Sequence, residues 1–125
     1  MWLRWISLSS AALLLQACAL PTTTETIPLP FQALGNEPGW SVVISPDHQA
    51  TITLNYGEQQ LDLLLPPAQV TYAGTHYRAE YQDQPFALDI IFNTCSDTMS
   101  DTSYPYETRL EILGKQYQGC GRPAP

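Results

Sequence analysis

The sequence predicts an all-β fold: a small antiparallel barrel or sandwich of about eight short strands, closed by one disulfide. From Phe31 onward, short segments of alternating apolar and polar residues are separated by clusters of Gly, Pro, Asn and Asp. No stretch of about ten residues follows the period of a helix. Two cysteines, Cys95 and Cys120, lie in the C-terminal part of the chain and are available to pair.

Each strand is predicted from its alternation and from the turn residues that bound it. Residues 35–39 form a turn in which Pro38-Gly39 suits a type II geometry, and Trp40 is expected to pack inward directly after it. A single helical turn is expected at residues 95–98, because aspartate and threonine favour helix starts. The strand candidates are residues 31–34, 40–45, 50–54, 60–65, 70–73, 75–81, 86–92, 106–113 and 116–119.

Residues 1–17 form a targeting segment. Arg4 supplies a positive start, and residues 6–15 are an apolar stretch too short to span a bilayer. The segment ends in the letters LQAC, which resemble a bacterial lipobox, and this resemblance implies cleavage before Cys18 and lipidation of its thiol. Several acyl chains, at about 0.8 kcal/mol per buried methylene, would anchor the protein stably. The alternative is an ordinary signal peptide, cut at an adjacent alanine.

The predicted domain organisation places a tether after the lipid anchor. Residues 18–30 hold three prolines and no hydrophobic period, so we expect them to be flexible and to connect the membrane to a single β domain at residues 31–125. Residue 19 is alanine and not aspartate. By the sorting rule of enteric bacterial lipoproteins, this implies the outer membrane, with the domain expected in the periplasm.

The charge of the chain narrows the classes of partner. The full chain has a net charge of −7, with 5 basic and 12 acidic residues. Removal of residues 1–17 leaves four basic and twelve acidic residues, a net charge of −8. This charge argues against nucleic acid and anionic lipid as partners. It fits a cationic protein such as lysozyme, and the alternative is that the acidic surface serves solubility alone.

The cysteines favour one disulfide. With Cys18 lipidated, Cys95 and Cys120 remain in an oxidising compartment and are expected to pair, closing a loop of about 25 residues that contributes roughly 3–4 kcal/mol. Two free buried thiols are the alternative. Pairing would hold the polar loop at residues 95–106 as a constrained platform, and we expect this loop to be the working surface. Glu37, which its turn does not require, is expected to bond the loop or to contact a partner.

The candidate residues for catalysis or metal binding are sparse, so the protein is expected to be non-catalytic, with no cofactor and no metal. His48 and His76 are both predicted to be solvated loop residues, and neither has further ligands at zinc spacing. Asp97 and Asp101 have a spacing compatible with a glycosidase pair, but in a loop rich in serine and threonine such aspartates are usually turn formers.

Three motifs in order resemble a family of small uncharacterised bacterial lipoproteins and periplasmic proteins. The resemblance spans the whole mature domain and implies no particular activity. The matching residues are Phe31 to Trp40 (FQALGNEPGW), Cys95, Asp97, Met99, Ser100, Tyr104, Pro105 and Gly119-Cys120-Gly121.

The loop also resembles that of the membrane-bound inhibitors of c-type lysozyme, which are small lipid-anchored β-barrels with a Ser-Gly-x-x-Tyr motif. Ser100 and Tyr104 have the same spacing, and the resemblance implies that Ser100 bonds a catalytic carboxylate in the lysozyme cleft. Asp101 stands where glycine is expected, and lysozyme carboxylates would repel it unless it turns away or meets a basic residue. The second motif of that family, built around a Trp and a Lys-Gly pair, is not found in this sequence. Gly114-Lys115 is the nearest match, with the two residues in reversed order.

The sequence therefore predicts a protein-binding envelope lipoprotein, with an inhibitor of c-type lysozyme-like hydrolases as its most concrete form. Ser100 and Tyr104 are expected to contact the partner, with Glu37 and Asp97 in support. A structural or assembly role in the envelope is the alternative. A small-ligand barrel is a third reading, which a densely filled core would disfavour.

Overall fold

A computed structural model describes residues 26–97 and 101–125 of the protein. The regular secondary structure of this part of the chain is made of β-strands and one short 3-10 helix, which confirms the predicted all-β class. In chain order the elements are β1 (Phe31–Asn36), β2 (Gly39–Ile44), β3 (Gln49–Leu54), η1 (Asn55–Gly57), β4 (Gln59–Leu64), β5 (Gln69–Thr71), β6 (Gly74–Tyr81), β7 (Gln84–Ile91), β8 (Cys95–Ser96), β9 (Ser103–Tyr104), β10 (Tyr106–Ile112) and β11 (Lys115–Pro123).

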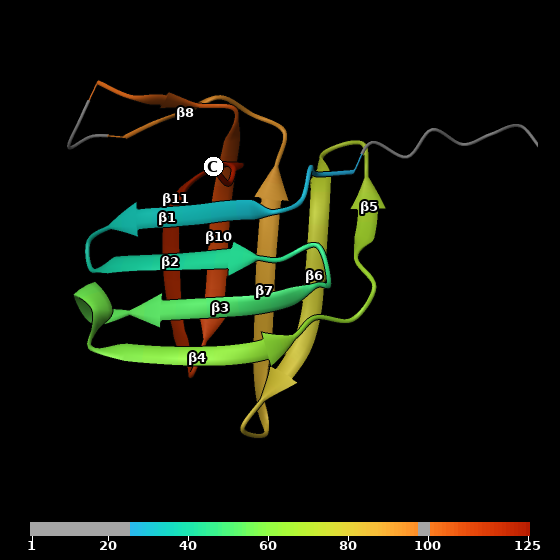
Figure 1. Ribbon diagram of the computed structural model, residues 1–125, viewed down its shortest axis with the longest axis vertical. Coiled ribbons are helices and arrows are strands. Elements are labelled where there is room, and N and C mark those ends of the chain that lie inside the picture. The colour runs from blue at the N-terminus through green and yellow to red at the C-terminus, as the bar shows by residue number, and fades with distance from the viewer. Residues whose placement is uncertain (1–25, 98–100) are drawn as a thin grey trace, which may run out of the picture.

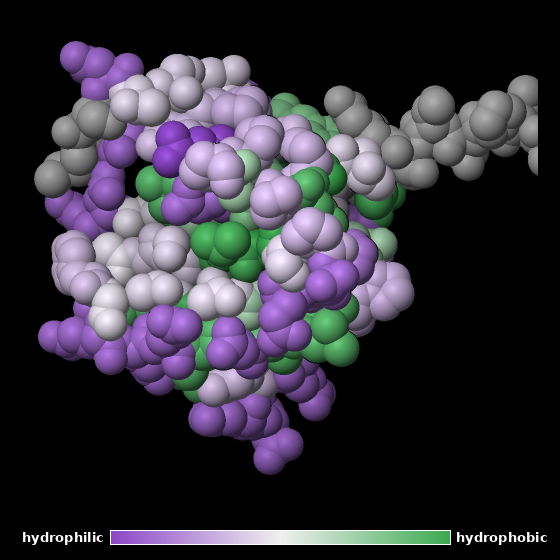
Figure 2. Space-filling view, in the orientation of Figure 1, coloured by the Kyte–Doolittle hydropathy of each residue, from purple (hydrophilic) through white to green (hydrophobic). Residues whose placement is uncertain are grey.

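Nine strands form one antiparallel sheet in the order β4-β3-β2-β1-β11-β10-β7-β6-β5, and β8 pairs with β9 separately. The large sheet curls on itself, so that β1–β4 cross steeply in front of β6, β7, β10 and β11 (Figure 1). Its edge strands, β4 and β5, stand at opposite ends of this order, which makes the described sheet a curled half-barrel. Figure 2 shows the outer face of the β1–β4 layer, with hydrophilic residues along its left and lower margins.

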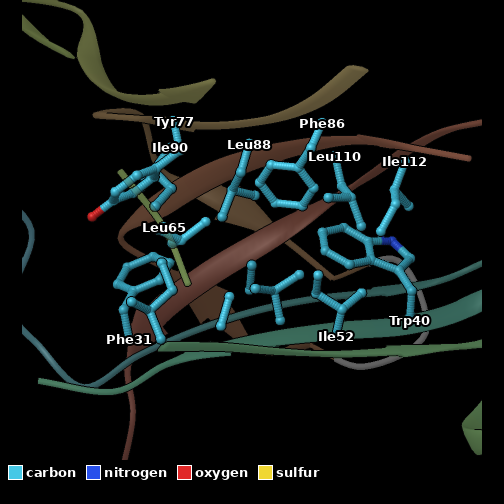
Figure 3. Packing of buried hydrophobic residues seen from close by; sticks show 14 of the residues in the cluster. Phe31, Trp40, Ile52, Leu65, Tyr77, Phe86, Leu88, Ile90, Leu110 and Ile112 are labelled. Carbon is cyan, nitrogen blue, oxygen red and sulfur yellow. The ribbon is translucent and has the colours of Figure 1, made fainter. Parts of the chain in front are cut away.

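The core lies between the inner faces of the two layers. Because successive side chains of a strand point to opposite faces, β2 buries Trp40, Val42 and Ile44 on one side only. Figure 3 shows Trp40 and Phe86 pointing into this common core from the two layers, and side chains fill the space between them. The inward position of Trp40 confirms the prediction, and its Nε1–H donates a hydrogen bond to the carbonyl of Gln118 at 3.2 Å.

Strand β11 joins the two layers, because it pairs with β10 on one side and with β1 on the other. The approach of β1 is unusually close. A Cβ at position 119 would overlap the carbonyl of Leu34, and a Cβ at position 121 would overlap the ring of Phe31. The two glycines of the Gly-Cys-Gly motif therefore have a steric role: they let the backbones of β1 and β11 pack against each other.

The turn between β1 and β2 differs from the prediction. The strand candidate at residues 31–34 continues to Asn36, and the pairing of Asn36 with Gly39 leaves only Glu37 and Pro38 in the turn. The Glu37–Pro38 bond is cis and Gly39 has no positive φ, so the geometry is that of a type VI turn and not of the predicted type II.

Two further predictions were wrong for a shared reason, which is pairing with distant residues. The closing strand extends to Pro123 instead of ending at residue 119, because its last residues pair with β1. In the described part of the range where a helical turn was expected, residues 95–97, the chain instead forms β8, in which Cys95 pairs with Tyr104. Neither partner is visible in the local sequence pattern.

The packed part of the domain begins earlier than the predicted boundary at Phe31. Ile27 is only 6% exposed and belongs to the core, and the N–H of Ala124 donates to the carbonyl of Pro30 at 2.9 Å. Among the described residues, no helix is long and apolar enough to cross a membrane.

We expect Ile27→Ala to lower the free energy of unfolding by about 2 kcal/mol, because it leaves a cavity in the core. Urea denaturation of the full-length protein measures this change. Leu64→Ala is the control, since Leu64 is 67% exposed and its truncation should change stability by less than about 0.5 kcal/mol. Equal, small effects of both substitutions would contradict the inclusion of Ile27 in the core.

Candidate functional site

A pocket of about 340 Å³ lies on the outer face of the sheet, between strands β1, β10 and β11 and the β8–β9 hairpin. We refer to it as the hairpin pocket. Alternation along the strands places its lining side chains outward: on β10, Thr108 and Leu110 are buried in the core while their neighbours point away from it. The lining residues used below are Asn36, Glu37, Asp97, Glu107 and Arg109.

The hairpin that covers this pocket is fixed to the sheet at two points. Cys95 and Cys120 form a disulfide with a Cα–Cα distance of 5.5 Å, as predicted. Nearer the tip, Nδ2 of Asn36 donates a hydrogen bond to Oδ1 of Asp97 at 2.5 Å. The hairpin is therefore attached both to β11 and to the end of β1, on either side of the pocket that it covers.

Tyr104 secures the hairpin from below. Its side chain is only 7% exposed, and the guanidinium of Arg122 lies 5.5 Å from the centre of its ring. A cation in this position attracts the face of the ring. Because Tyr104 is buried, it offers little surface to a partner, and its structural effect is to position the hairpin.

The other predicted site residues fall at the same end of the molecule. Asp97 and Glu37 both line the hairpin pocket, and Glu37 is exposed. The predicted bond between the turn and the loop is present, but Asn36 makes it, not Glu37. Ser100 lies outside the described residues, whereas Asp101 is described and exposed.

The charged groups of the pocket lining are mostly acidic. Among the described residues, the lining includes three carboxylates, those of Glu37, Asp97 and Glu107, and one guanidinium, that of Arg109. Such a lining accepts hydrogen bonds from cationic and amide donors more readily than it binds anions. Among the described residues there is no group of three His, Cys, Asp or Glu side chains placed to hold a metal ion.

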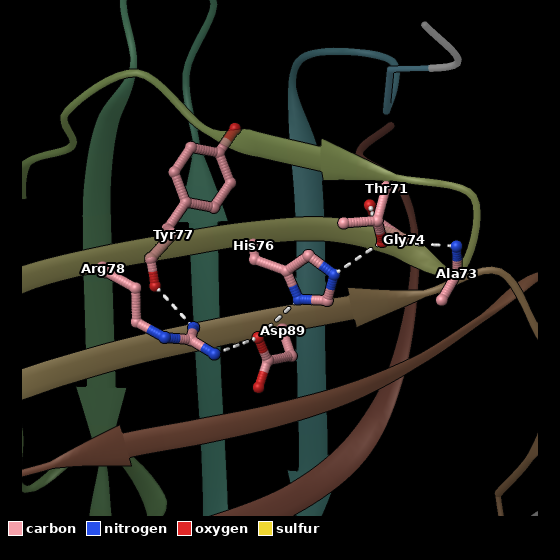
Figure 4. A network of polar contacts seen from close by, with 7 residues as sticks. All are labelled: Thr71, Ala73, Gly74, His76, Tyr77, Arg78 and Asp89. Atoms are coloured by element: carbon pink, nitrogen blue, oxygen red, sulfur yellow. Dashed lines mark hydrogen bonds and ion pairs between the residues drawn. The ribbon is translucent and has the colours of Figure 1, made fainter.

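A second polar network lies on the outer face of β6 and β7 (Figure 4). Nδ1 of His76 is 2.7 Å from Oδ1 of Asp89, its Nε2 is 3.1 Å from Oγ1 of Thr71, and Arg78 pairs with the same Asp89 oxygen at 2.8 Å. His76 was predicted to be a solvated loop residue, and this was wrong: it lies within β6, where its cross-strand partner on β7 is Asp89.

This network has the connectivity of a hydroxyl, imidazole and carboxylate relay, but the hydroxyl and the carboxylate each have a further, structural partner. The Thr71 hydroxyl also accepts the N–H of Ala73 at 3.3 Å and so stabilises the β5–β6 turn. Burial alone would raise the pKa of Asp89, but hydrogen bonds from His76 and Arg78 and the charge of Arg78 outweigh it and lower the pKa. The network ties three strands together.

Tyr56, which was not among the predicted site residues, lies beside Asn36 of the hairpin pocket. It lies in η1 with φ 57° and ψ 32°, between two other residues of positive φ, and it is 76% exposed. A left-handed conformation costs a bulky residue roughly 1–2 kcal/mol. Its hydroxyl donates to the carbonyl of Asn36 at 3.0 Å, and its ring lies against Gly39, where a Cβ would overlap it.

In comparisons with known proteins, no family model, curated protein or solved structure matches the chain. The two motif resemblances therefore stay predictions. The function has to be argued from the geometry and charge of the sites described above.

We expect Asp89→Asn to destabilise the protein by about 1 kcal/mol at neutral pH, because it removes a charged acceptor shared by two partners. The folded-state pKa of Asp89 is lowered below its usual 3.8, so its contribution is present above that pH and is lost as the pH falls through the folded-state value. Melting temperatures of both proteins should therefore converge below about pH 3.8. Asp47→Asn, at an exposed turn, is the control; a constant gap between wild type and Asp89→Asn at all pH values would contradict this account.

We expect the double substitution Cys95→Ser, Cys120→Ser to lower the free energy of unfolding by about 3 kcal/mol, because the unfolded chain regains the freedom of the loop that the disulfide closes. Guanidinium denaturation measures the loss. The wild-type protein in excess reductant should match the double variant. Wild-type stability in the double variant would mean that the disulfide adds nothing to the fold.

Proposed function

We propose that the protein is a non-catalytic lipoprotein of the bacterial outer membrane, anchored through Cys18, whose domain binds a cationic protein at the hairpin pocket. A c-type lysozyme or a similar glycan hydrolase is the partner we propose, with inhibition as the consequence. The observation that carries this proposal is the fixed hairpin: a disulfide and the Asn36–Asp97 hydrogen bond hold it over an acidic pocket at an exposed end of the molecule.

A fixed binding surface favours affinity. Loops that must be ordered on binding cost about 0.5–1.5 kcal/mol for each side chain that is immobilised. The hairpin avoids part of this cost, because its base is already joined to β11 and Tyr104 is already packed beneath Arg122. Tyr104 would thus support binding by holding the hairpin in place, while the contacts to the partner would come from its neighbours.

The negative charge around the pocket favours a cationic partner. Glu37 and Asp97 lie on the rim, and the mature domain carries a net charge of −8. Charge complementarity of this kind mainly speeds association and selects among partners, and it weakens as salt is added. We propose that Ser100 completes the contact, because its spacing from Tyr104 resembles that of the inhibitor motif and would put its hydroxyl in the hydrolase cleft.

We expect the full-length protein, purified in a mild non-ionic detergent, to inhibit a c-type lysozyme at micromolar concentration and low ionic strength. Glu37→Gln should weaken inhibition about threefold, because a rim charge mainly affects the association rate. Asp83→Asn in the β6–β7 turn removes the same charge away from the pocket and should leave inhibition unchanged. Lysis of a peptidoglycan suspension is the readout.

The outcome of this assay also separates the two proposed classes of function. No inhibition by the wild-type protein under these conditions would contradict the inhibitor proposal. If the protein then co-purified with a resident envelope protein and Ser100→Ala left that association intact, a structural or assembly role would replace it. Equal effects of Glu37→Gln and Asp83→Asn would show that only net charge matters and would remove the pocket from the proposal.

A further inference from the structure

Tyr56 is a large aromatic residue that the fold exposes in a costly backbone conformation. It is 76% exposed, and its φ of 57° is an outlier for a bulky side chain. Glycine or asparagine would adopt the same conformation with less strain. Strained residues concentrate at binding sites and catalytic sites, where the conformation serves a function.

The ring of Tyr56 is held in place. Its hydroxyl donates to the carbonyl of Asn36 at 3.0 Å, and one side of the ring lies against Gly39. The other side faces solvent. A fixed aromatic ring with one free side loses little conformational freedom when a partner covers it, which is the property that makes tyrosine frequent among the residues that dominate binding energy.

The surroundings of Tyr56 are acidic and adjoin the hairpin pocket, which Asn36 and Glu37 line. Asn36 links the two features, because its carbonyl accepts from Tyr56 while its side chain donates to Asp97. Glu37 follows Asn36 directly, and Glu58 lies two residues after Tyr56; both carboxylates are exposed. The β1–β2 turn and η1 lie together at the left margin of Figure 1, where Figure 2 shows hydrophilic residues.

From these observations we infer that Tyr56 is the aromatic anchor of the partner-binding surface and that its free side receives an arginine or lysine side chain of the partner. The cation would lie over the ring and meet the carboxylates of Glu37 and Glu58. The inference rests on the proposed binding of a cationic protein and names the contact that would dominate it. It adds a residue outside the hairpin to the binding surface.

The matched pair Tyr56→Asn and Tyr72→Asn tests the anchor. Tyr72 is 100% exposed in the β5–β6 turn and is the control for loss of an exposed tyrosine. Asparagine tolerates the conformation at position 56, so the melting temperature of Tyr56→Asn should stay within about 3 °C of wild type. We expect Tyr56→Asn to weaken binding of a c-type lysozyme at least tenfold, about the effect of losing a dominant contact, and Tyr72→Asn to change it less than about twofold. Equal affinity of Tyr56→Asn and wild type would overturn the inference and leave the proposed function standing.

A second measurement separates failure of the anchor from failure of the proposed target. The wild-type protein in detergent is titrated with a short oligoarginine peptide, and the ring signals of Tyr56 and Tyr72 are followed by NMR. Larger shifts at Tyr56, lost at high salt, support the anchor even if lysozyme does not bind. Equal shifts of both rings, or none, overturn it. Because this experiment uses the wild-type chain, it also decides the question if Tyr56→Asn fails to fold.

Discussion

The close approach of strands β1 and β11 is the contact on which the rest of the structure depends. β1 pairs with β2 on one side and with β11 on the other, so it joins the layer of the first four strands to the layer formed by the remaining strands (Figure 1). The approach requires positions 119 and 121 to lack a side chain, since a Cβ there would overlap the carbonyl of Leu34 and the ring of Phe31. A larger residue at either position would force apart the two layers whose inner faces form the core, and core packing at native density tolerates little such displacement.

Strand β11 also determines where the hairpin pocket lies. Cys120 lies between the two glycines, and alternation along β11 directs its side chain to the outer face, where it meets Cys95. The β8–β9 hairpin pairs over only two residues on each side and is rich in polar side chains, so it has little apolar surface with which to hold itself against the sheet. The disulfide and the buried Tyr104 supply that attachment. One strand thus determines both the joining of the layers and the position of the hairpin on their outer face.

The parts of this structure that were predictable from sequence are those with a local signal. Strand β10 alternates along its whole length. The pairing of Cys95 with Cys120 was expected on the premise that Cys18 is lipidated and that the domain lies in an oxidising compartment, which leaves two cysteines to pair. The extension of β11 to Pro123 was not predictable, because it depends on pairing with β1 at the far end of the chain. Of the candidate site, Glu37 was expected to bond the loop at residues 95–106 or to contact a partner, but the hydrogen bond that joins the β1–β2 turn to the hairpin belongs to Asn36. Tyr56 could not be identified from the sequence, because an exposed residue is not part of a hydrophobic pattern. Its contacts are with the β1–β2 turn, which is distant in sequence.

Asn36 makes the candidate surface one unit. Its side chain holds the hairpin through Asp97, and its carbonyl holds the ring of Tyr56, so neither feature can shift without disturbing the end of β1. The energies involved are compatible with a stable domain: the left-handed conformation of Tyr56 costs roughly 1–2 kcal/mol, whereas closing the loop between the cysteines contributes about 3 kcal/mol. The disulfide therefore more than offsets the strain at Tyr56. The hairpin and the ring of Tyr56 are ordered when the protein folds, so a partner would not have to order them on binding. More of the contact energy would therefore contribute to affinity.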